Sequence, residues 1–104
     1  MLRAAVDEAK KGVGARVHVG PVFSSDYFYM QQPGVFDGLT AIGTLAVEME
    51  SAGLYGTAAA EHAEALTVLT VSDNLLDGSG DMSPEERETA YQGALRIAAA
   101  ALLA

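Results

Sequence analysis

The chain has 104 residues, with 14 Asp and Glu against 6 Lys and Arg, a formal net charge of −8 and no Cys. This length predicts a single domain, and the negative charge disfavours binding to nucleic-acid polymers. The lack of Cys excludes a disulfide framework, a zinc–thiolate site and a Cys nucleophile. Residues 97–104 form an apolar C-terminal stretch that is too short to span a membrane. We therefore expect a soluble, cytoplasmic α/β domain.

Hydrophobic periodicity and turn signals predict helices and strands in alternation along the chain. This alternation favours a three-layer α/β/α sheet with mixed or largely parallel strands and helices on its faces. The expected order is a helix at residues 2–11, a strand at 15–23 interrupted near Gly20, a helix at 35–43, a strand at 44–47, a helix at 51–63, a strand at 65–71 and a helix at 83–102.

The last two elements carry the clearest local signals. Residues 65–71 are a nearly continuous apolar, β-branched run, which is typical of a central strand buried on both faces, so we expect Val68 and Val71 to be buried. Ser83, Pro84 and Glu86 have the spacing of a capping box with Pro in the first turn. They predict the start of one long helix that covers a face of the sheet.

Acidic residues follow two of the predicted strands. Val47 leads into Glu48 and Glu50, and a second apolar strand leads into Asp73. In open α/β sheets, ligands bind beyond the carboxyl ends of the strands, so Glu50 and Asp73 are candidates for one pocket. Acids are also ordinary in turns, and a simple turn cap explains Asp73 equally well.

The distribution of charge limits the ligand. No Lys or Arg lies between Arg16 and Arg87, whereas eleven acids lie from Asp26 to Glu86. A site in this stretch suits a neutral, hydroxyl-rich or cationic ligand, because a phosphate would need Arg87, another chain or further sequence. His18 and His62 lack metal-ligand spacing, so we predict no metal site.

Three aromatic residues stand in a row at positions 27–29. Such a cluster is able to stack a flat ligand, although composition alone favours ordinary packing in the core or on the surface.

Three segments together resemble the bacterial hexameric purine nucleoside phosphorylases, which belong to the nucleoside phosphorylase and nucleosidase superfamily. The Glu-Met-Glu and Ser-Asp motifs at this separation are typical of the superfamily, whereas Ala-Gly-Leu-Tyr-Gly and the aromatic triplet indicate the purine phosphorylase branch. The segments are residues 23–29 (Phe-Ser-Ser-Asp-Tyr-Phe-Tyr), 47–56 (Val-Glu-Met-Glu-Ser-Ala-Gly-Leu-Tyr-Gly) and 70–73 (Thr-Val-Ser-Asp).

The resemblance implies a purine nucleoside as substrate. Glu50 would accept hydrogen bonds from the ribose 2′- and 3′-hydroxyls, and Met49 would pack under the sugar. Val47 and Glu48 would line the pocket, and Phe28 would stack near the purine.

The same resemblance implies the groups that act on the base. Ser72 would orient the base, and Asp73 would be the general acid that protonates purine N7, so that the base leaves as a neutral group. Arg87 matches an Arg of the family's last helix that approaches this Asp when the ligand is enclosed. The Gly-rich stretch at 74–82 departs from the family's usual pattern, which bears on base preference.

The resemblance also implies that this chain is only the C-terminal portion of one phosphorylase domain. The family's phosphate site, a Gly-rich turn with Arg and Ser residues in the N-terminal half, is absent from residues 1–104. We expect phosphate as co-substrate if that half is supplied, no cofactor, and a homo-oligomer.

Two alternatives stay open beside the phosphorylase. A nucleosidase would use water in place of phosphate, which explains the missing cations, although the residues after Glu50 argue against it. A non-catalytic nucleoside-binding or assembly fragment would bind without cleaving.

Overall fold

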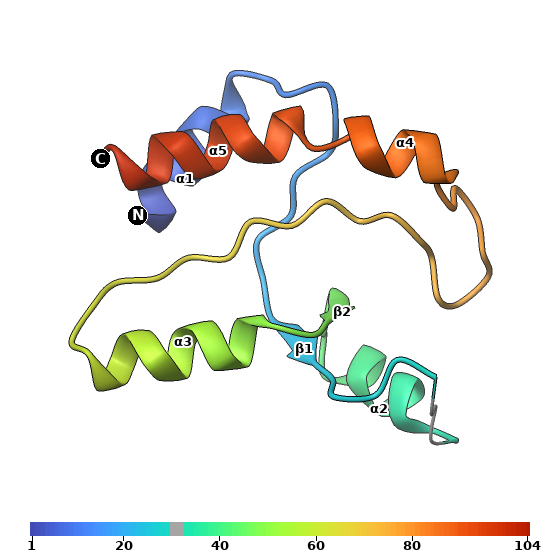
Figure 1. Cartoon of the computed structure of the whole chain (residues 1–104). Coiled ribbons are helices and arrows are strands. Elements are labelled where there is room, and N and C mark those ends of the chain that lie inside the picture. Colours follow the sequence, from blue (N-terminus) through green and yellow to red (C-terminus); the bar gives the residue numbers. More distant parts are fainter. Residues whose placement is uncertain (30–32) are drawn as a thin grey trace. The chain divides into compact units, whose positions relative to one another are not determined.

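The computed structural model describes residues 1–29 and 33–104 and divides the chain into two compact units (Figure 1). Unit 1 combines Met1–Val17 with Leu66–Ala104, and unit 2 is His18–Ala65. Within the described residues, no helix has the length and apolar character required to traverse a lipid bilayer.

Unit 2 is a small β-α-β-α arrangement. Strands β1 (Val22–Ser24) and β2 (Ala46–Glu48) are parallel, and the register pairs Val22 with Ala46 and Ser24 with Glu48. Helix α2 (Val35–Ala41) lies in the crossover between the two strands, and helix α3 (Ser51–Ala60) follows β2. Parallel strands with helices in and after the crossover confirm the predicted α/β class.

The turn into β2 depends on glycine. After α2, Gly43 has a φ of 82°, its N–H donates to the Thr40 carbonyl, and the Thr44 N–H donates to the Leu39 carbonyl. This is a Schellman motif, which satisfies the last carbonyls of a helix and reverses the chain. It brings residues 44–48 back beside β1.

Unit 1 contains three helices: α1 (Leu2–Lys10), α4 (Pro84–Thr89) and α5 (Gln92–Leu102). Helices α1 and α5 lie side by side (Figure 1), and their buried residues are Ala5, Ile97 and Ala101. Arg96 ties the two helices together at the surface, because it bonds to the Glu8 carboxylate at 2.7 Å and to the Gly12 carbonyl at 3.2 Å. Leu66 and Val68 pack against this core.

Several predicted elements are confirmed with shifted ends. The helices expected at residues 2–11, 35–43 and 51–63 form as α1, α2 and α3, and the predicted strand at 44–47 forms as β2. The strand expected at 15–23 is reduced to β1, and the Gly20–Pro21 interruption lies just before it.

The strand prediction for residues 65–71 is wrong for this structure. The segment belongs to no strand, and Val71 is 64 % exposed, although Leu66 and Val68 are partly covered. A strand requires a neighbour that pairs with its backbone N–H and C=O groups. Within the described residues, pairing joins only β1 and β2, so an apolar run with strand character is left without a ladder.

The single long helix predicted at residues 83–102 is also wrong, because it is broken into α4 and α5 at Ala90 and Tyr91. The Thr89 hydroxyl donates to the carbonyls of Glu85 at 3.3 Å and Glu86 at 3.4 Å, a contact that bends helices and competes with the regular ladder. The start of the helix is as predicted. Ser83 and Glu86 form the full capping box, with Pro84 in the first turn.

Candidate functional site

The Glu-Met-Glu motif lies where β2 passes into α3. Strand β2 ends at Glu48, Glu50 is the N-cap of α3, and the helix begins at Ser51. We call residues 48–52 the strand–helix junction. The Glu50 side chain does not cap the helix, so the backbone N–H groups of its first turn need other partners.

The Glu48 carboxylate supplies most of these partners. It accepts hydrogen bonds from the backbone N–H of Glu50 at 2.7 Å and of Ser51 at 2.6 Å, and a third from the Ser24 hydroxyl. The Ser24 Oγ accepts in turn from the Ala52 N–H at 2.9 Å. A carboxylate at a helix N-terminus is favoured by the helix dipole as well as by these bonds. Glu48 and Ser24 together therefore cap α3.

This arrangement stabilises the ionised form of Glu48. Partial burial raises the pKa of this carboxyl, but hydrogen bonds from the Ser24 hydroxyl and from the backbone N–H of Ser51 and Glu50 outweigh burial and lower the pKa to about 2. A carboxylate has about four lone-pair positions, and three of the Glu48 positions are in use. Contact between Glu48 and a bound sugar, implied by the family resemblance, stays a prediction.

Glu50 is placed differently from Glu48, although the two residues are nearly adjacent. Its side chain is exposed, and the hydrogen bond described for it comes from the neighbouring Met49 N–H at 3.3 Å. Met49 is 41 % exposed, and Val47 is half-buried in β2. The junction thus fixes the backbone of Glu50 and leaves its carboxylate accessible, which is the state required of a group that binds two hydroxyls.

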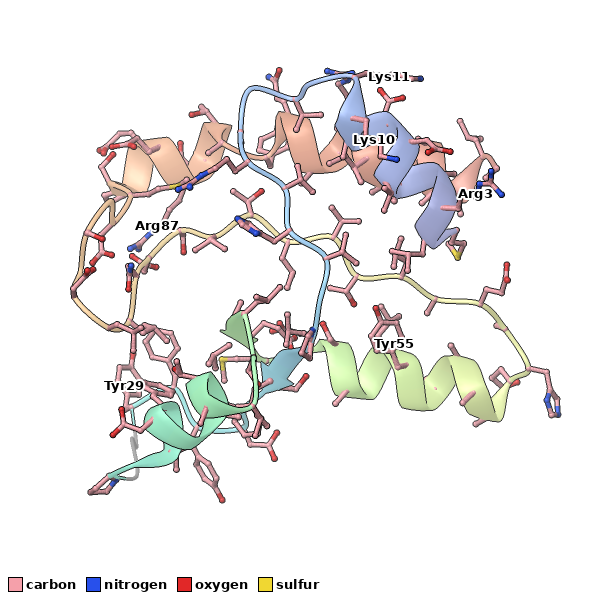
Figure 2. All side chains as sticks on the ribbon, turned by 180° about the vertical axis from the view of Figure 1, so that it is seen from behind. Arg3, Lys10, Lys11, Tyr29, Tyr55 and Arg87 are labelled. Carbon is pink, nitrogen blue, oxygen red and sulfur yellow. The ribbon has the colours of Figure 1, made fainter. Side chains whose placement is uncertain are left out.

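The aromatic triplet lies at the surface of unit 2. Phe28 is 69 % exposed and Tyr29 is 90 % exposed, and their rings meet edge to face with centroids 4.9 Å apart. Figure 2 labels Tyr29, which extends outward from this unit. Composition favours ordinary packing in the core or on the surface, and the contact between these two exposed rings is packing on the surface. The proposed stacking of a purine on Phe28 stays a prediction.

The second group of candidate residues lies in unit 1. The Ser72 hydroxyl donates to Asp73 Oδ2 at 2.6 Å, and Arg87 Nη2 donates to Asp73 Oδ1 at 2.6 Å. Arg87, which is labelled in Figure 2, belongs to α4 and forms this ion pair from there. The Met82 N–H donates to the Ser72 carbonyl at 2.7 Å. This bond closes the loop that connects Ser72 and Asp73 to the start of α4. The structure thus brings Ser72, Asp73 and Arg87 together.

Both oxygens of Asp73 accept hydrogen bonds, so this carboxyl is held as an anion. The Ser72 hydroxyl lowers the pKa of Asp73, partial burial opposes that change, and the bond and charge of Arg87 lower the pKa further. Asp73 in this arrangement is an acceptor at neutral pH. A proton donor built on Asp73 has to gain its proton when this pairing changes.

Sequence reasoning missed Ser24, which connects β1 to the junction. Its position in the β1–β2 register, directly opposite Glu48, is the feature that gives it this role. The available signal was a hydroxyl residue at the end of one strand and an acid at the end of the next.

No group of three or more His, Asp or Glu side chains suited to a metal ion occurs within residues 1–29 and 33–104. The candidate residues form two groups, each described within its own unit. The junction and Phe28 belong to unit 2, whereas Ser72, Asp73 and Arg87 belong to unit 1.

Comparison with known proteins agrees with the motifs. The chain is 48 % identical over 97 residues to the purine nucleoside phosphorylase DeoD-type of Colwellia psychrerythraea, covering 93 % of this chain and 41 % of that protein. Identity to the purine nucleoside phosphorylase DeoD-type of Hahella chejuensis is 51 % over 84 residues, covering 81 % of this chain and 35 % of the relative. Identity to the purine nucleoside phosphorylase DeoD-type of Yersinia enterocolitica is 45 % over 103 residues, covering 99 % of this chain and 42 % of that protein.

The chain therefore spans about two fifths of the length of these curated relatives. The family model of the phosphorylase superfamily matches residues 1–104. A match over the whole chain, together with relatives of this identity, establishes the family: the chain belongs to the phosphorylase superfamily.

Proposed function

We propose that the chain forms the nucleoside-binding and proton-donating part of a purine nucleoside phosphorylase. The reaction is purine nucleoside plus phosphate to free purine base plus ribose 1-phosphate. The names of the relatives support this choice of reaction. The observation that carries the proposal is the strand–helix junction. There the Glu48 carboxylate caps α3, and the nearby Glu50 carboxylate stays accessible.

Glu50 binds the ribose in this proposal. Two vicinal hydroxyls match the two oxygens of one carboxylate, and such charge-assisted bonds are stronger than bonds between neutral groups. Met49 packs its thioether against the sugar, and Phe28 offers an exposed ring to the purine. Binding of the ribose and the base thus draws on residues 28 and 47–50, all of which belong to unit 2.

Asp73 serves the leaving base in this proposal. Cleavage of the glycosidic bond places negative charge on the departing purine, and a proton delivered to N7 neutralises it. Ser72 and Arg87 hold Asp73 as an anion before the base arrives. The family resemblance implies that Arg87 approaches Asp73 when the ligand is enclosed, whereas the two side chains are already paired at 2.6 Å in this structure. Because Ser72 and Arg87 both lower the pKa of Asp73, delivery of a proton to N7 needs these contacts to change as the purine binds.

Phosphate is the attacking co-substrate. The stretch between Arg16 and Arg87 holds no Lys or Arg, so the cations for phosphate come from sequence outside this stretch or from another subunit. We further propose a cytoplasmic homo-oligomer that requires no additional cofactor.

The test is cleavage of inosine by this chain. The chain is assayed alone and together with the part of a curated relative that this chain does not cover, in each case with and without phosphate. Release of hypoxanthine that requires phosphate supports the proposal. Release without phosphate indicates a nucleosidase, and nucleoside binding without release indicates a non-catalytic module.

One variant, tested with two nucleosides, shows whether the junction binds the ribose. Glu50→Gln keeps the shape of the side chain but removes the charge, which weakens binding of inosine by about 1.5–3 kcal/mol. 2′-Deoxyinosine loses less, because it makes one of the two bonds. Equal affinity of the wild-type chain and Glu50→Gln for inosine would contradict the assignment.

A further inference from the structure

One hydroxyl connects three elements at the strand–helix junction. Ser24 is the last residue of β1 and lies in register opposite Glu48, the last residue of β2. Its Oγ donates to the Glu48 carboxylate and accepts from the Ala52 N–H in the first turn of α3 at 2.9 Å. Ser24 therefore fixes where the Glu48 carboxylate lies relative to the start of the helix.

The Glu48 carboxylate in turn restrains the backbone of Glu50. Its Oε2 accepts from the Glu50 N–H at 2.7 Å and from the Ser51 N–H at 2.6 Å. Ser51 is only 3 % exposed, so the residue after Glu50 is held inside the fold. The backbone of Glu50 is thus restrained on both sides, whereas its side chain is exposed.

From this chain of contacts we propose that Ser24 is a positioning residue that orients the Glu50 carboxylate toward the ribose hydroxyls. The inference rests on the proposed function, because it assigns Ser24 to the same nucleoside site. A bidentate pair needs both carboxylate oxygens in place, whereas a single bond tolerates rotation of the group. Loss of the Ser24 restraint therefore reduces ribonucleoside binding more than 2′-deoxyribonucleoside binding.

The experiment compares the wild-type chain with Ser24→Ala, Ser24→Thr and Ser25→Ala. Ser25 is the matched control, because the hydrogen bonds of its hydroxyl within the described part of the chain are local, to the backbone of Tyr27 at 3.1 Å. Calorimetry with inosine and adenosine and with their 2′-deoxy counterparts gives the ratio of ribonucleoside to deoxyribonucleoside affinity. In Ser24→Ala this ratio falls on the order of three- to tenfold, the size expected for one hydrogen bond of a pair.

The controls separate positioning from stability. Ser24→Thr keeps a hydroxyl and restores the ratio, and Ser25→Ala leaves it unchanged. An equal loss for both kinds of nucleoside in Ser24→Ala, or no rescue by Thr, would show that Ser24 only stabilises the fold and would overturn the inference. If circular dichroism shows that Ser24→Ala does not fold, Ser24→Cys, which keeps the bulk with a weaker donor, takes its place in the comparison.

Failure of the inference differs from failure of the proposed function. If Glu50→Gln lowers the ratio but Ser24→Ala does not, Glu50 binds the ribose and Ser24 does not position it. If the wild-type chain shows no preference for ribonucleosides and Glu50→Gln changes nothing, the proposed ribose site itself is wrong, and the role of Ser24 is overturned with it.

Discussion

Replacement of Glu48 by Gln tests the junction most directly. Glu48→Gln keeps the size of the side chain and one carbonyl oxygen, which is able to accept from the N–H groups of Glu50 and Ser51. The amide NH₂ group then faces Ser24, which previously donated to this side chain. The substitution therefore removes the charge and reverses one hydrogen bond.

The expected loss follows from these bonds. A hydrogen bond to a charged group contributes about 1.5–3 kcal/mol, and one between neutral groups contributes about 0.5–1.5 kcal/mol. Two hydrogen bonds are retained, and each loses about 1 kcal/mol of charge assistance. Because the side chain is only half-buried, water screens part of this loss, so the total loss of folding stability is about 1–3 kcal/mol. Amide hydrogen exchange at Glu50, Ser51 and Ala52, measured by NMR at neutral pH, should accelerate by roughly 5- to 150-fold.

The same substitution has a defined pH dependence. The pKa of Glu48 is lowered from 4.5 to about 2 in the folded chain, so its contribution to stability is fully present above about pH 4.5. That contribution is lost as the pH falls from about 4.5 to about 2. In urea unfolding followed by circular dichroism, the difference between the wild-type chain and Glu48→Gln should shrink over this range.

The matched control is Glu50→Gln, two residues away. Its exposed carboxylate accepts no bond from the first turn of α3, so stability should change by less than about 0.5 kcal/mol. Unchanged exchange at the Ser51 amide in Glu48→Gln, or a difference that persists at pH 2, would refute the capping role of Glu48.

Three further predictions concern unit 1. In a preparation that cleaves inosine, Asp73→Asn should slow the reaction by roughly 10²–10⁴-fold and spare 7-methylated purine nucleosides, which need no proton at N7; steady-state rates that fall equally for both would indicate a turn cap instead. Arg87→Ala should raise the pKa of Asp73 toward its ordinary value, because only the Ser72 bond then lowers it; NMR titration of the carboxyl carbon measures this, and an unmoved titration would contradict the pairing. Ile97→Ala should destabilise the α1–α5 pair by about 2–3 kcal/mol, the low end for such a change, because this core is shallow. Urea unfolding measures this loss, and a loss below about 0.5 kcal/mol would mean that Ile97 contributes little to the stability of the core.

The elements that the sequence predicts well are those set by local chemistry. The capping box at Ser83 and Glu86 involves residues three apart, and α1 follows from apolar residues at helical spacing. Residues 65–71 show the limit of this approach. Their composition is that of a buried strand, but a strand exists only with a pairing partner, and pairing depends on residues distant in sequence.

The candidate site was predictable to a similar degree. The motifs identified Glu50, Asp73 and Arg87, and the structure brings the last two into contact at 2.6 Å. Sequence reasoning assigned both Glu48 and Glu50 to the substrate and did not predict that Glu48 caps α3. Their difference arises from the β1–β2 register, which places Ser24 beside Glu48 and leaves Glu50 outside. That register is a long-range property that local patterns do not reveal.

The break at Ala90 and Tyr91 separates two helices that differ in how much of their surface is buried in the core of unit 1. Helix α5 contributes Ile97 and Ala101 to the core, whereas α4 has no buried residue. Outside its own turns, α4 is joined to Asp73 through the Arg87 pair. Local opening of α4 therefore needs little free energy and leaves the α1–α5 core intact. Such opening would withdraw the guanidinium from Asp73, so high salt, which weakens exposed ion pairs, should loosen α4 before it affects α5.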